Sequence, residues 1–295
     1  MRFSAALACV LLAAFRAPGQ TPAKAGELEL SILTYNIRYD NPDDGDDRWE
    51  KRRDEVARLI KDHDPDVVGL QEALRNQLDD LSKALPTYAE IGVGRDDGKT
   101  KGEYAAILYR KDRFKVVDSG TFWFSDTPET AGSKSWGNRI ARVCTWAKLV
   151  ERASGRAVSV YNVHLDHESQ PSREKSAELL AQRALAAIRD DPVIVTGDFN
   201  AGESNPAVAS LKAGATGFVD SFRVAHPDEK AIDTFNGFGK GHGTKDKIDY
   251  IWVQPSARVE GAGIDRRSKD GRFPSDHFAV WSIVRLPEKF GPLNR

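Results

Sequence analysis

Val193-Ile194-Val195-Thr196-Gly197-Asp198 is a short run of mainly apolar residues that ends in a carboxylate. The segment 126 positions earlier, Val67-Val68-Gly69-Leu70-Gln71-Glu72, has the same form. Such β-branched runs are typical of strands that are covered on both faces. Tyr35-Asn36-Ile37 recurs as Tyr161-Asn162-Val163 at the same spacing. A constant offset over several segments indicates an internal repeat.

Each half of the repeat predicts a strand, a helix and a second strand. In the first half, residues 28–37 alternate between apolar and polar, and a helical pattern follows from Trp49 to Ile60. In the second half, residues 158–165 form the strand, and Ser172 is the predicted cap of a helix that runs to Ile188. The alternative is that two unrelated strand–helix–strand units fall into the same spacing by chance.

Four further strands are expected, over residues 103–110, 143–150, 248–253 and 278–284. Arg142 precedes the second of these and His277 the last, so the halves match here at a looser offset of 135. No linker rich in Pro or Ser separates the halves. We therefore predict one domain over residues 26–290, followed by a short tail at 291–295.

The composition is that of a globular protein. Of the 295 residues, 40% are hydrophobic and 29% are charged, which excludes a disordered or fibrous chain. Lys and Arg total 43 against 44 for Asp and Glu, a formal net charge of −1. A tight, sequence-blind nucleic-acid binder normally has a basic excess, so this balance disfavours that class.

The first residues have the pattern of a secretory signal. Arg2 is followed by an apolar run from Ala5 to Phe15 and then by Arg16 and small residues. Eleven apolar residues are too few to span a bilayer, which needs about 20. We expect residues 1–25 to be removed and the mature protein to be an exported periplasmic or extracellular monomer without stable membrane insertion. The alternative is a buried N-terminal helix.

Polar, ionisable residues follow several of the predicted strands. They are Asn36, Glu72, Asn162, His164, Asp198, Asn200, Asp276 and His277, and Asp249 stands at the start of another strand. Taken singly, each has an ordinary structural interpretation as a turn former or a surface ion-pair partner. Together, carboxylate and amide oxygens favour Mg²⁺ or Mn²⁺ as a cofactor. With imidazoles nearby, this set predicts phosphoester hydrolysis.

The series YNIR, LQEA, NVHLDH, GDFNA, IDYIWV and SDHFAV resembles the endonuclease/exonuclease/phosphatase superfamily, whose fold is like that of deoxyribonuclease I. These motifs span roughly residues 28–286, and GDFN with a terminal SDH is the specific part. The resemblance implies an α/β fold: a four-layer α-β-β-α sandwich of two facing mixed sheets with a pseudo-twofold internal repeat. The repeat found from the spacing agrees with that fold. The long polar loops resemble an exported bacterial branch of the family.

The resemblance also implies a role for each site residue. Glu72, Asn36 and Asp276 match the metal-binding positions, and Asp198 with Asn200 match the residues that act on the attacking water. His277 matches a phosphate-contacting histidine held by Asp249, and His164 matches a second one that Asn162 would brace. Arg142 is the expected phosphate contact, with Arg139 as the competing candidate.

Three polar loops are candidate walls of the cleft: residues 91–101, 120–137 and 235–239. Trp136 is the aromatic residue expected to stack on substrate, because such rings bind bases and sugars. Asp166 and His167 are expected to form a solvated turn.

These observations predict a divalent-metal-dependent phosphodiesterase. The alternatives are a nuclease acting on DNA or RNA, an inositol-phosphate-type phosphomonoesterase, and a catalytically silent binding module on the same fold. The expected partner is a phosphoester substrate, whether nucleic acid, phospholipid or sugar phosphate.

Overall fold

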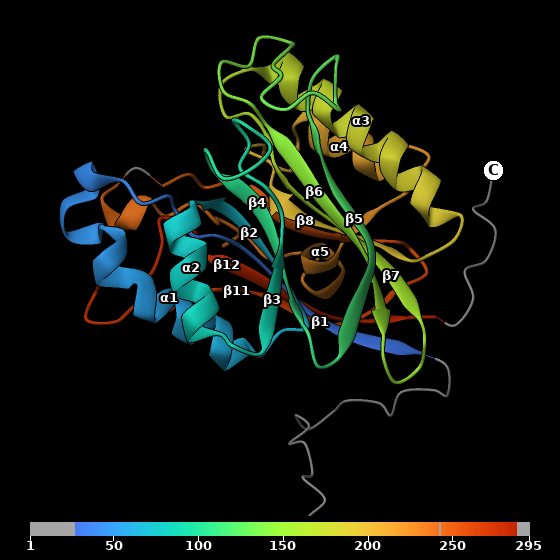
Figure 1. The fold of residues 1–295 in the computed structure, drawn as a ribbon, viewed down its shortest axis with the longest axis horizontal. Coiled ribbons are helices and arrows are strands. Elements are labelled where there is room, and N and C mark those ends of the chain that lie inside the picture. Colours follow the sequence, from blue (N-terminus) through green and yellow to red (C-terminus); the bar gives the residue numbers. More distant parts are fainter. Residues whose placement is uncertain (1–26, 242, 288–295) are drawn as a thin grey trace, which may run out of the picture.

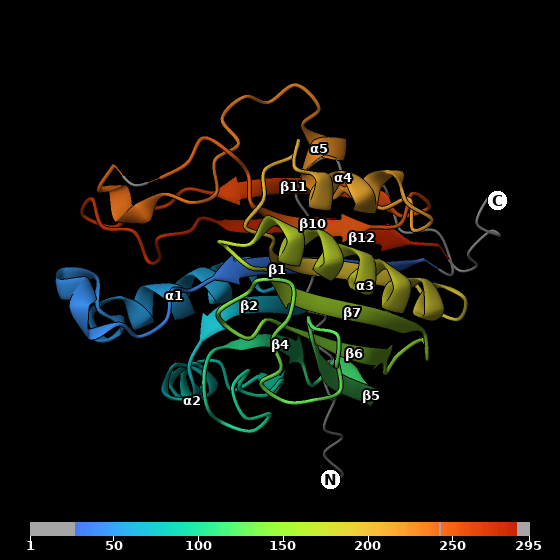
Figure 2. The same ribbon diagram turned by 90° about the horizontal axis from the view of Figure 1, so that it is seen from above.

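The computed structural model describes residues 27–241 and 243–287. The predicted signal (1–25) and tail (291–295) lie outside these residues. Within the described part, two sheets of six strands face each other, with helices on their outer faces (Figures 1 and 2). This is the four-layer sandwich that the sequence predicts.

The first sheet contains β11 (Arg258–Asp265), β12 (Ala279–Leu286), β1 (Leu28–Asn36), β2 (Val67–Ala73), β4 (Tyr104–Arg110) and β3 (Tyr88–Ile91), in that order. The second contains β5 (Phe114–Trp123), β6 (Val143–Glu151), β7 (Ala157–His164), β8 (Val193–Asp198), β10 (Asp249–Val253) and β9 (Val219–Asp220).

Read in these orders, the two sheets have the same topology. The central pairs β1–β2 and β7–β8 are parallel, and every other neighbouring pair is antiparallel. β7 and β8 therefore stand in the second sheet where β1 and β2 stand in the first, as the offset of 126 predicts.

The helices complete the outer layers. α1 (Trp49–His63) and α2 (Arg75–Ala84) pack on the first sheet, and α3 (Gln170–Ile188) and α4 (Pro206–Ala213) on the second. α5 (Ser221–Ala225) and the short 3₁₀ turns η1 (Pro42–Asp47) and η2 (Gly237–Gly239) lie in connections. α3 begins earlier than predicted, because the capping hydroxyl is that of Ser169, which accepts from the backbone of Ser172.

The core lies in three layers. The middle layer, between the sheets, is aliphatic and includes Leu30, Ile32, Val160, Ile194 and Ile251. The outer layers join each sheet to its helices. Because the strands are covered on both faces, they read as nearly continuous apolar runs. Among the described residues, no helix has both the length and the apolar character needed to cross a bilayer.

Candidate active site

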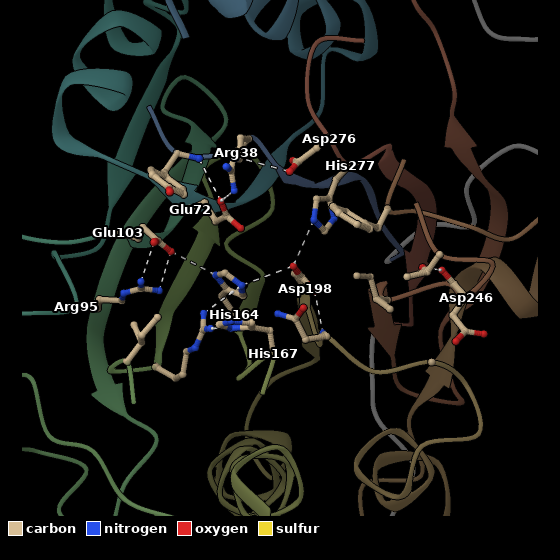
Figure 3. Close-up of a pocket in the computed structure, with 18 residues that line it drawn as sticks. Arg38, Glu72, Arg95, Glu103, His164, His167, Asp198, Asp246, Asp276 and His277 are labelled. Carbon is tan, nitrogen blue, oxygen red and sulfur yellow. Dashed lines mark hydrogen bonds and ion pairs between the residues drawn. The ribbon is translucent and has the colours of Figure 1, made fainter. Parts of the chain in front are cut away.

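The carboxyl ends of the parallel strand pairs meet at one edge of the sandwich, beside a cavity of about 660 Å³ (Figure 3). β1 ends at Asn36, β7 at His164 and β8 at Asp198. Ligand sites of α/β sheets form at such edges. The cavity is lined by Arg38, Tyr39, Glu72, Arg95, Glu103, Ile140, Arg142, His164, His167, Asp198, Asn200, Gly202, Phe235, Thr244, Asp246, Ile248, Asp276 and His277.

Glu72 reaches the cavity because its strand is irregular at that point. The register of β2 against β4 shifts between Leu70 and Ala73, and Glu72 has a φ of +62°. Its carboxylate accepts from Asn36 Nδ2 at 3.1 Å and from the Tyr39 backbone at 3.2 Å. Arg38 and Asn200 also have positive φ values, so strained backbone is concentrated at this site.

Asp198 is the centre of the site. Its Oδ2 accepts from Asn36 Nδ2 at 3.0 Å and lies 3.6 Å from His164 Nε2 and 3.8 Å from His277 Nε2. Its Oδ1 accepts from the backbone of Asn200 at 2.8 Å. Burial, followed by the nearby charge of Asp249, raises the pKa of Asp198 to about 7. A carboxyl group with that pKa can exchange a proton near neutral pH.

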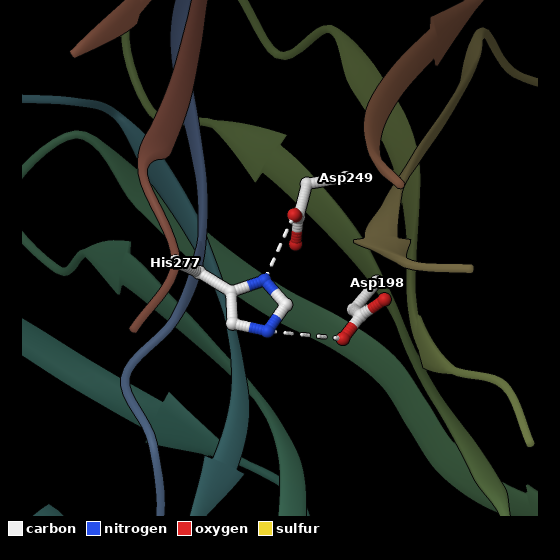
Figure 4. A group of neighbouring side chains, drawn as sticks. All are labelled: Asp198, Asp249 and His277. Atoms are coloured by element: carbon white, nitrogen blue, oxygen red, sulfur yellow. Dashed lines mark hydrogen bonds and ion pairs between the residues drawn. The ribbon is translucent and has the colours of Figure 1, made fainter. Parts of the chain in front are cut away.

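His277 is held between two carboxylates (Figure 4). Its Nδ1 lies 2.9 Å from Asp249 Oδ2, as the sequence predicts for this pair. Burial disfavours the imidazolium, but the charge and hydrogen bond of Asp249 outweigh it and raise the pKa of His277 to about 10. Asp198, Asp249 and His277 offer ligand atoms within 4.8 Å of one another, a spacing that suits a cation. The short bond to Asp249 already occupies Nδ1, so this group is better described as a hydrogen-bonded acid–histidine–acid array.

The predicted metal-binding residues lie together beside this array. Arg38 stands between two of them, with Nη1 4.0 Å from Glu72 Oε2 and Nε 3.9 Å from Asp276 Oδ2. Burial and the charge of Glu72 raise the pKa of Asp276 to about 6, although His277 and Arg38 oppose this. Crowded carboxylate oxygens of this kind fit a hard divalent cation. Asn36 departs from the expected role, because its Nδ2 donates to Glu72 and Asp198 and its Oδ1 accepts from the backbone of Arg38, so its oxygen does not face the carboxylates.

A second cluster surrounds His164. Arg142 is almost fully buried; its Nη1 lies 3.2 Å from His164 Nε2, its Nη2 2.6 Å from His167 Nδ1 and its Nε 3.3 Å from Asp166 Oδ2. An arginine only donates, so these imidazole nitrogens act as acceptors here. Burial and then the charge of Arg142 hold the pKa of His164 well below its usual value. His164 is therefore neutral, in contrast to His277.

This cluster corrects one prediction and resolves an alternative. Asp166 departs from the expected solvated turn, because it is buried against Arg142. His167 is half-exposed at a bend, as expected, and its ring also lines the cavity. Arg142 and not Arg139 is the arginine of the site, because the side chain of Arg139 is 83% exposed and pairs with Glu168.

Asn162 does not bind phosphate or brace His164. β7 continues for two residues beyond it, so Asn162 lies inside the sandwich and not at the strand end. Its Nδ2 donates to the carbonyls of Leu70 and Ala106 in the facing sheet, and its Oδ1 accepts from Gln71 and Thr196. Asn162 joins the two sheets.

Trp136 also lies apart from the cavity. Its indole donates to Asp126 at 2.8 Å, and its ring packs beside the outer core of the second sheet near Lys175. Of the three candidate loops, 91–101 contributes Arg95 and 235–239 contributes Phe235.

Several residues of the site escaped prediction, among them Arg38, Asp246, Glu103 and Arg95. Glu103 precedes β4, lies 3.7 Å from His164 Nδ1 and pairs with Arg95. Burial raises the pKa of Glu103 to about 7 despite the charge of Arg95. Arg95 is fixed because its carbonyl accepts from the Trp123 indole at 2.6 Å. In the sequence, both residues stand among ordinary surface charges, and no spacing signal separates them from the others.

The chain belongs to the endonuclease/exonuclease/phosphatase family, whose sequence model matches residues 33–277. It is similar to the crystal structure of an endonuclease/exonuclease/phosphatase from Bacteroides vulgatus, with 37% identity and a TM-score of 0.83, covering 88% of this chain and 99% of that one. A mannosyl-6-phosphatase from Bacteroides thetaiotaomicron is 35% identical with a TM-score of 0.78, covering 86% of this chain and 99% of that one.

A curated 5′-tyrosyl-DNA phosphodiesterase from Caenorhabditis elegans is 26% identical over 272 residues, which cover 85% of this chain and 66% of that protein. The chain spans 59% to 66% of the length of this and two other curated relatives. Members of the family are phosphoester hydrolases, and the site described above has the acid, histidine and arginine groups that such chemistry uses.

Proposed function

We propose that this protein is a divalent-metal-dependent phosphatase that hydrolyses a small sugar-type phosphomonoester. The proposal rests on one observation: three groups surround a single atom, Asp198 Oδ2. Asn36 donates to it, and the Nε2 atoms of His164 and His277 lie within 4 Å of it. These groups come from both halves of the repeat, so the fold itself assembles the reacting centre.

Glu72 and Asp276 would hold Mg²⁺ or Mn²⁺, which when bound neutralises phosphate charge, and Asn36 would orient the Glu72 carboxylate through its hydrogen bond. Asp198 would orient the attacking water and take its proton, and the side chain of Asn200 would help to place that water. His277, protonated through Asp249, would donate to a phosphate oxygen, which stabilises the charge that develops there.

Arg142 and His164 would bind the remaining phosphate oxygens. Arg142 presents a fixed, planar set of donors, which suits a dianionic phosphate. On substrate entry its bond to His164 would be exchanged for bonds to the phosphate. This exchange would free His164 for contact with the ester.

The monoester assignment departs from the predicted phosphodiesterase. It is supported by the 35% identity to a mannosyl-6-phosphatase over nearly the whole of that chain. A phosphodiesterase is the second candidate, because the cavity extends to both sides of Asp198, which leaves room for two ester groups (Figure 3).

A substrate panel tests the proposal. Purified protein with Mg²⁺ or Mn²⁺ would be assayed on mannose 6-phosphate, inositol phosphates, bis(p-nitrophenyl) phosphate, sphingomyelin, RNA and plasmid DNA. We expect phosphate release from the sugar phosphate and its loss with a chelator. Faster cleavage of a diester or nucleic acid would favour the second candidate. No cleavage with either ion would favour the silent binding module.

We also propose that the mature protein is exported. The support is the Arg2-to-Arg16 signal pattern of the sequence. Expression of the full chain in a bacterial host, fractionation and intact-mass measurement test this. A mass that retains residues 1–25, in the cytoplasmic fraction, would contradict it.

A further inference from the structure

The cavity has two chemically different sides. The arginine side consists of Arg95 with Glu103, and of Arg142 with His167. The Asp246 side consists of Asp246 and its neighbours Gly202, Phe235, Thr244 and Ile248. Figure 3 shows Asp246 on the opposite side of Asp198 from Arg95 and Glu103. Arg95 and Arg142 therefore line the arginine side, and protonated His277 stands beside Phe235 where the two sides meet. The Asp246 side itself has a carboxylate, a hydroxyl, an aromatic ring and an aliphatic side chain.

This asymmetry orients a phosphomonoester. The phosphoryl group belongs at the centre, toward Arg142, because a dianion is attracted by the guanidinium and repelled by Asp246. The alcohol part of the ester must then extend along the Asp246 side.

We infer that the Asp246 side is a subsite for a neutral, polyhydroxylated ring. This inference rests on the proposed phosphatase function and names its substrate class. The carboxylate of Asp246 would accept hydrogen bonds from ring hydroxyls, and the face of Phe235 would contact ring C–H groups. Sites for sugars combine polar groups that fix hydroxyls with an apolar face of this kind.

The structure holds both residues in place while leaving their binding groups free. The backbones of Phe235 and His277 form an isolated antiparallel β-bridge, and their ring centroids lie 5.0 Å apart. The ring of Phe235 therefore borders the reacting centre. The main-chain carbonyl of Asp246 accepts from Thr234 and Thr244, which fixes this segment. Across residues 27–241 and 243–287, no hydrogen bond or ion pair occupies the Asp246 carboxylate.

Gly202 lets this carboxylate take its position. A Cβ at residue 202 would lie 3.0 Å from Asp246 Cγ, closer than side chains normally pack. An alanine there would push the carboxylate without changing its charge. Gly202→Ala is therefore a second, independent means of disturbing the subsite.

A carboxylate beside an aromatic ring also attracts a quaternary ammonium group. A hydroxyl-rich ring is favoured here, because Thr244 adds a neutral polar group and Phe235 is the only aromatic residue among those lining the cavity on this side. A phosphocholine substrate is thus the competing outcome that the experiment must separate.

The test compares kcat/KM for four probes with Mg²⁺: mannose 6-phosphate, glucose 1,6-bisphosphate, phosphocholine and p-nitrophenyl phosphate. The variants are Asp246→Asn, Gly202→Ala and Asp228→Asn; the last removes one exposed carboxylate outside the cavity. We expect wild type to prefer mannose 6-phosphate over the bisphosphate and phosphocholine by about tenfold or more.

Asp246→Asn should lower kcat/KM for mannose 6-phosphate about tenfold, because one hydrogen bond to a charged group contributes about that much. The loss of kcat/KM for p-nitrophenyl phosphate should be smaller. The ratio of kcat/KM for glucose 1,6-bisphosphate to kcat/KM for mannose 6-phosphate should rise at least about fivefold, because a repulsive charge is removed. Gly202→Ala should lower the ratio of kcat/KM for mannose 6-phosphate to kcat/KM for p-nitrophenyl phosphate. Asp228→Asn should have the same kcat/KM values as wild type.

Equal effects on all probes, or a wild-type preference for phosphocholine or the bisphosphate, would overturn the subsite while leaving the phosphatase function standing. Turnover of none of the four probes by wild type, with Mg²⁺ or Mn²⁺, would overturn the phosphatase function and the subsite with it. Thermal unfolding midpoints close to wild type would show that the variants are folded.

Discussion

Asn36 donates a hydrogen bond of 3.0 Å from Nδ2 to Oδ2 of Asp198, although 162 residues separate them in the sequence. Asn36 ends β1 in one sheet and Asp198 ends β8 in the other. Asn36 also donates to Glu72 at 3.1 Å, so one amide connects the carboxylate proposed to activate water with the one proposed to bind the metal. The active site is thus a contact between the two halves of the repeat.

Replacing Asn36 tests this contact. Asn36→Ala removes a fixed donor shared by two carboxylates and should lower kcat about 10²-fold, as loss of a preorganised donor does in other active sites. Steady-state phosphate release measures the effect, and circular dichroism confirms the fold. A kcat within twofold of wild type would contradict the role given to this bond.

Asn162→Ala is the matched control, because Asn162 is the repeat equivalent of Asn36. Three of its four hydrogen bonds join the sheets, the fourth is to Thr196 in its own sheet, and none touches a cavity group. The substitution should lower the free energy of unfolding by about 3 kcal/mol, because buried partners lose their bonds. We expect kcat to stay within about threefold. Denaturant unfolding measures the stability, and kinetics on the same sample measure kcat. A large loss of kcat with unchanged stability would contradict the structural role given to Asn162.

Divalent cations should stabilise the protein more at high pH than at low pH. Burial, together with neighbouring carboxylates, raises the pKa of Asp198 to about 7 and that of Asp276 to about 6, against unfolded values near 4. Between about pH 4 and 7 these two carboxyl groups bind more protons in the folded chain than in the unfolded chain, so their contribution to stability without metal falls as the pH rises.

Mg²⁺ competes with the proton of Asp276, so its stabilising effect should be small near pH 5 and full above pH 7. Thermal unfolding midpoints with and without Mg²⁺ across this range provide the measurement. An equal shift at pH 5 and pH 8 would show that Asp276 does not bind the ion.

Arg142→Lys tests the phosphate contact. Lysine cannot reproduce the three directed bonds of the guanidinium to Asp166, His164 and His167. We expect KM for a phosphomonoester to rise about tenfold or more. Arg139→Lys, at an exposed position three residues earlier, should leave KM unchanged. Equal effects of the two substitutions would reject Arg142 as the specific contact.

The sequence predicts the architecture well because the internal repeat shows which strands of the two halves are equivalent. The offset of 126 places β1 and β2 opposite β7 and β8, and the sheet orders agree. The pairing of Asp249 with His277 followed from the family resemblance, whose motifs contain both residues. The repeat depends on local pattern and chain order, which a single sequence contains.

The predictions that were wrong concern residues near strand ends and in loops. Asn162 was expected at the strand end, by analogy with Asn36, but β7 runs two residues further and brings His164 to the edge. Asp166 looks like part of a polar turn until Arg142 is placed against it. Glu103 and Arg95 enter the site through loop packing on Trp123, which leaves no periodic signal.

Metal-dependent phosphate release by wild type and Asp198→Asn tests the central claim most directly. The account predicts release from mannose 6-phosphate with Mg²⁺, none with a chelator, and a kcat for Asp198→Asn lower by about 10³-fold or more, because the proton acceptor is lost. Full activity of Asp198→Asn, or undiminished release in the presence of the chelator, would contradict it.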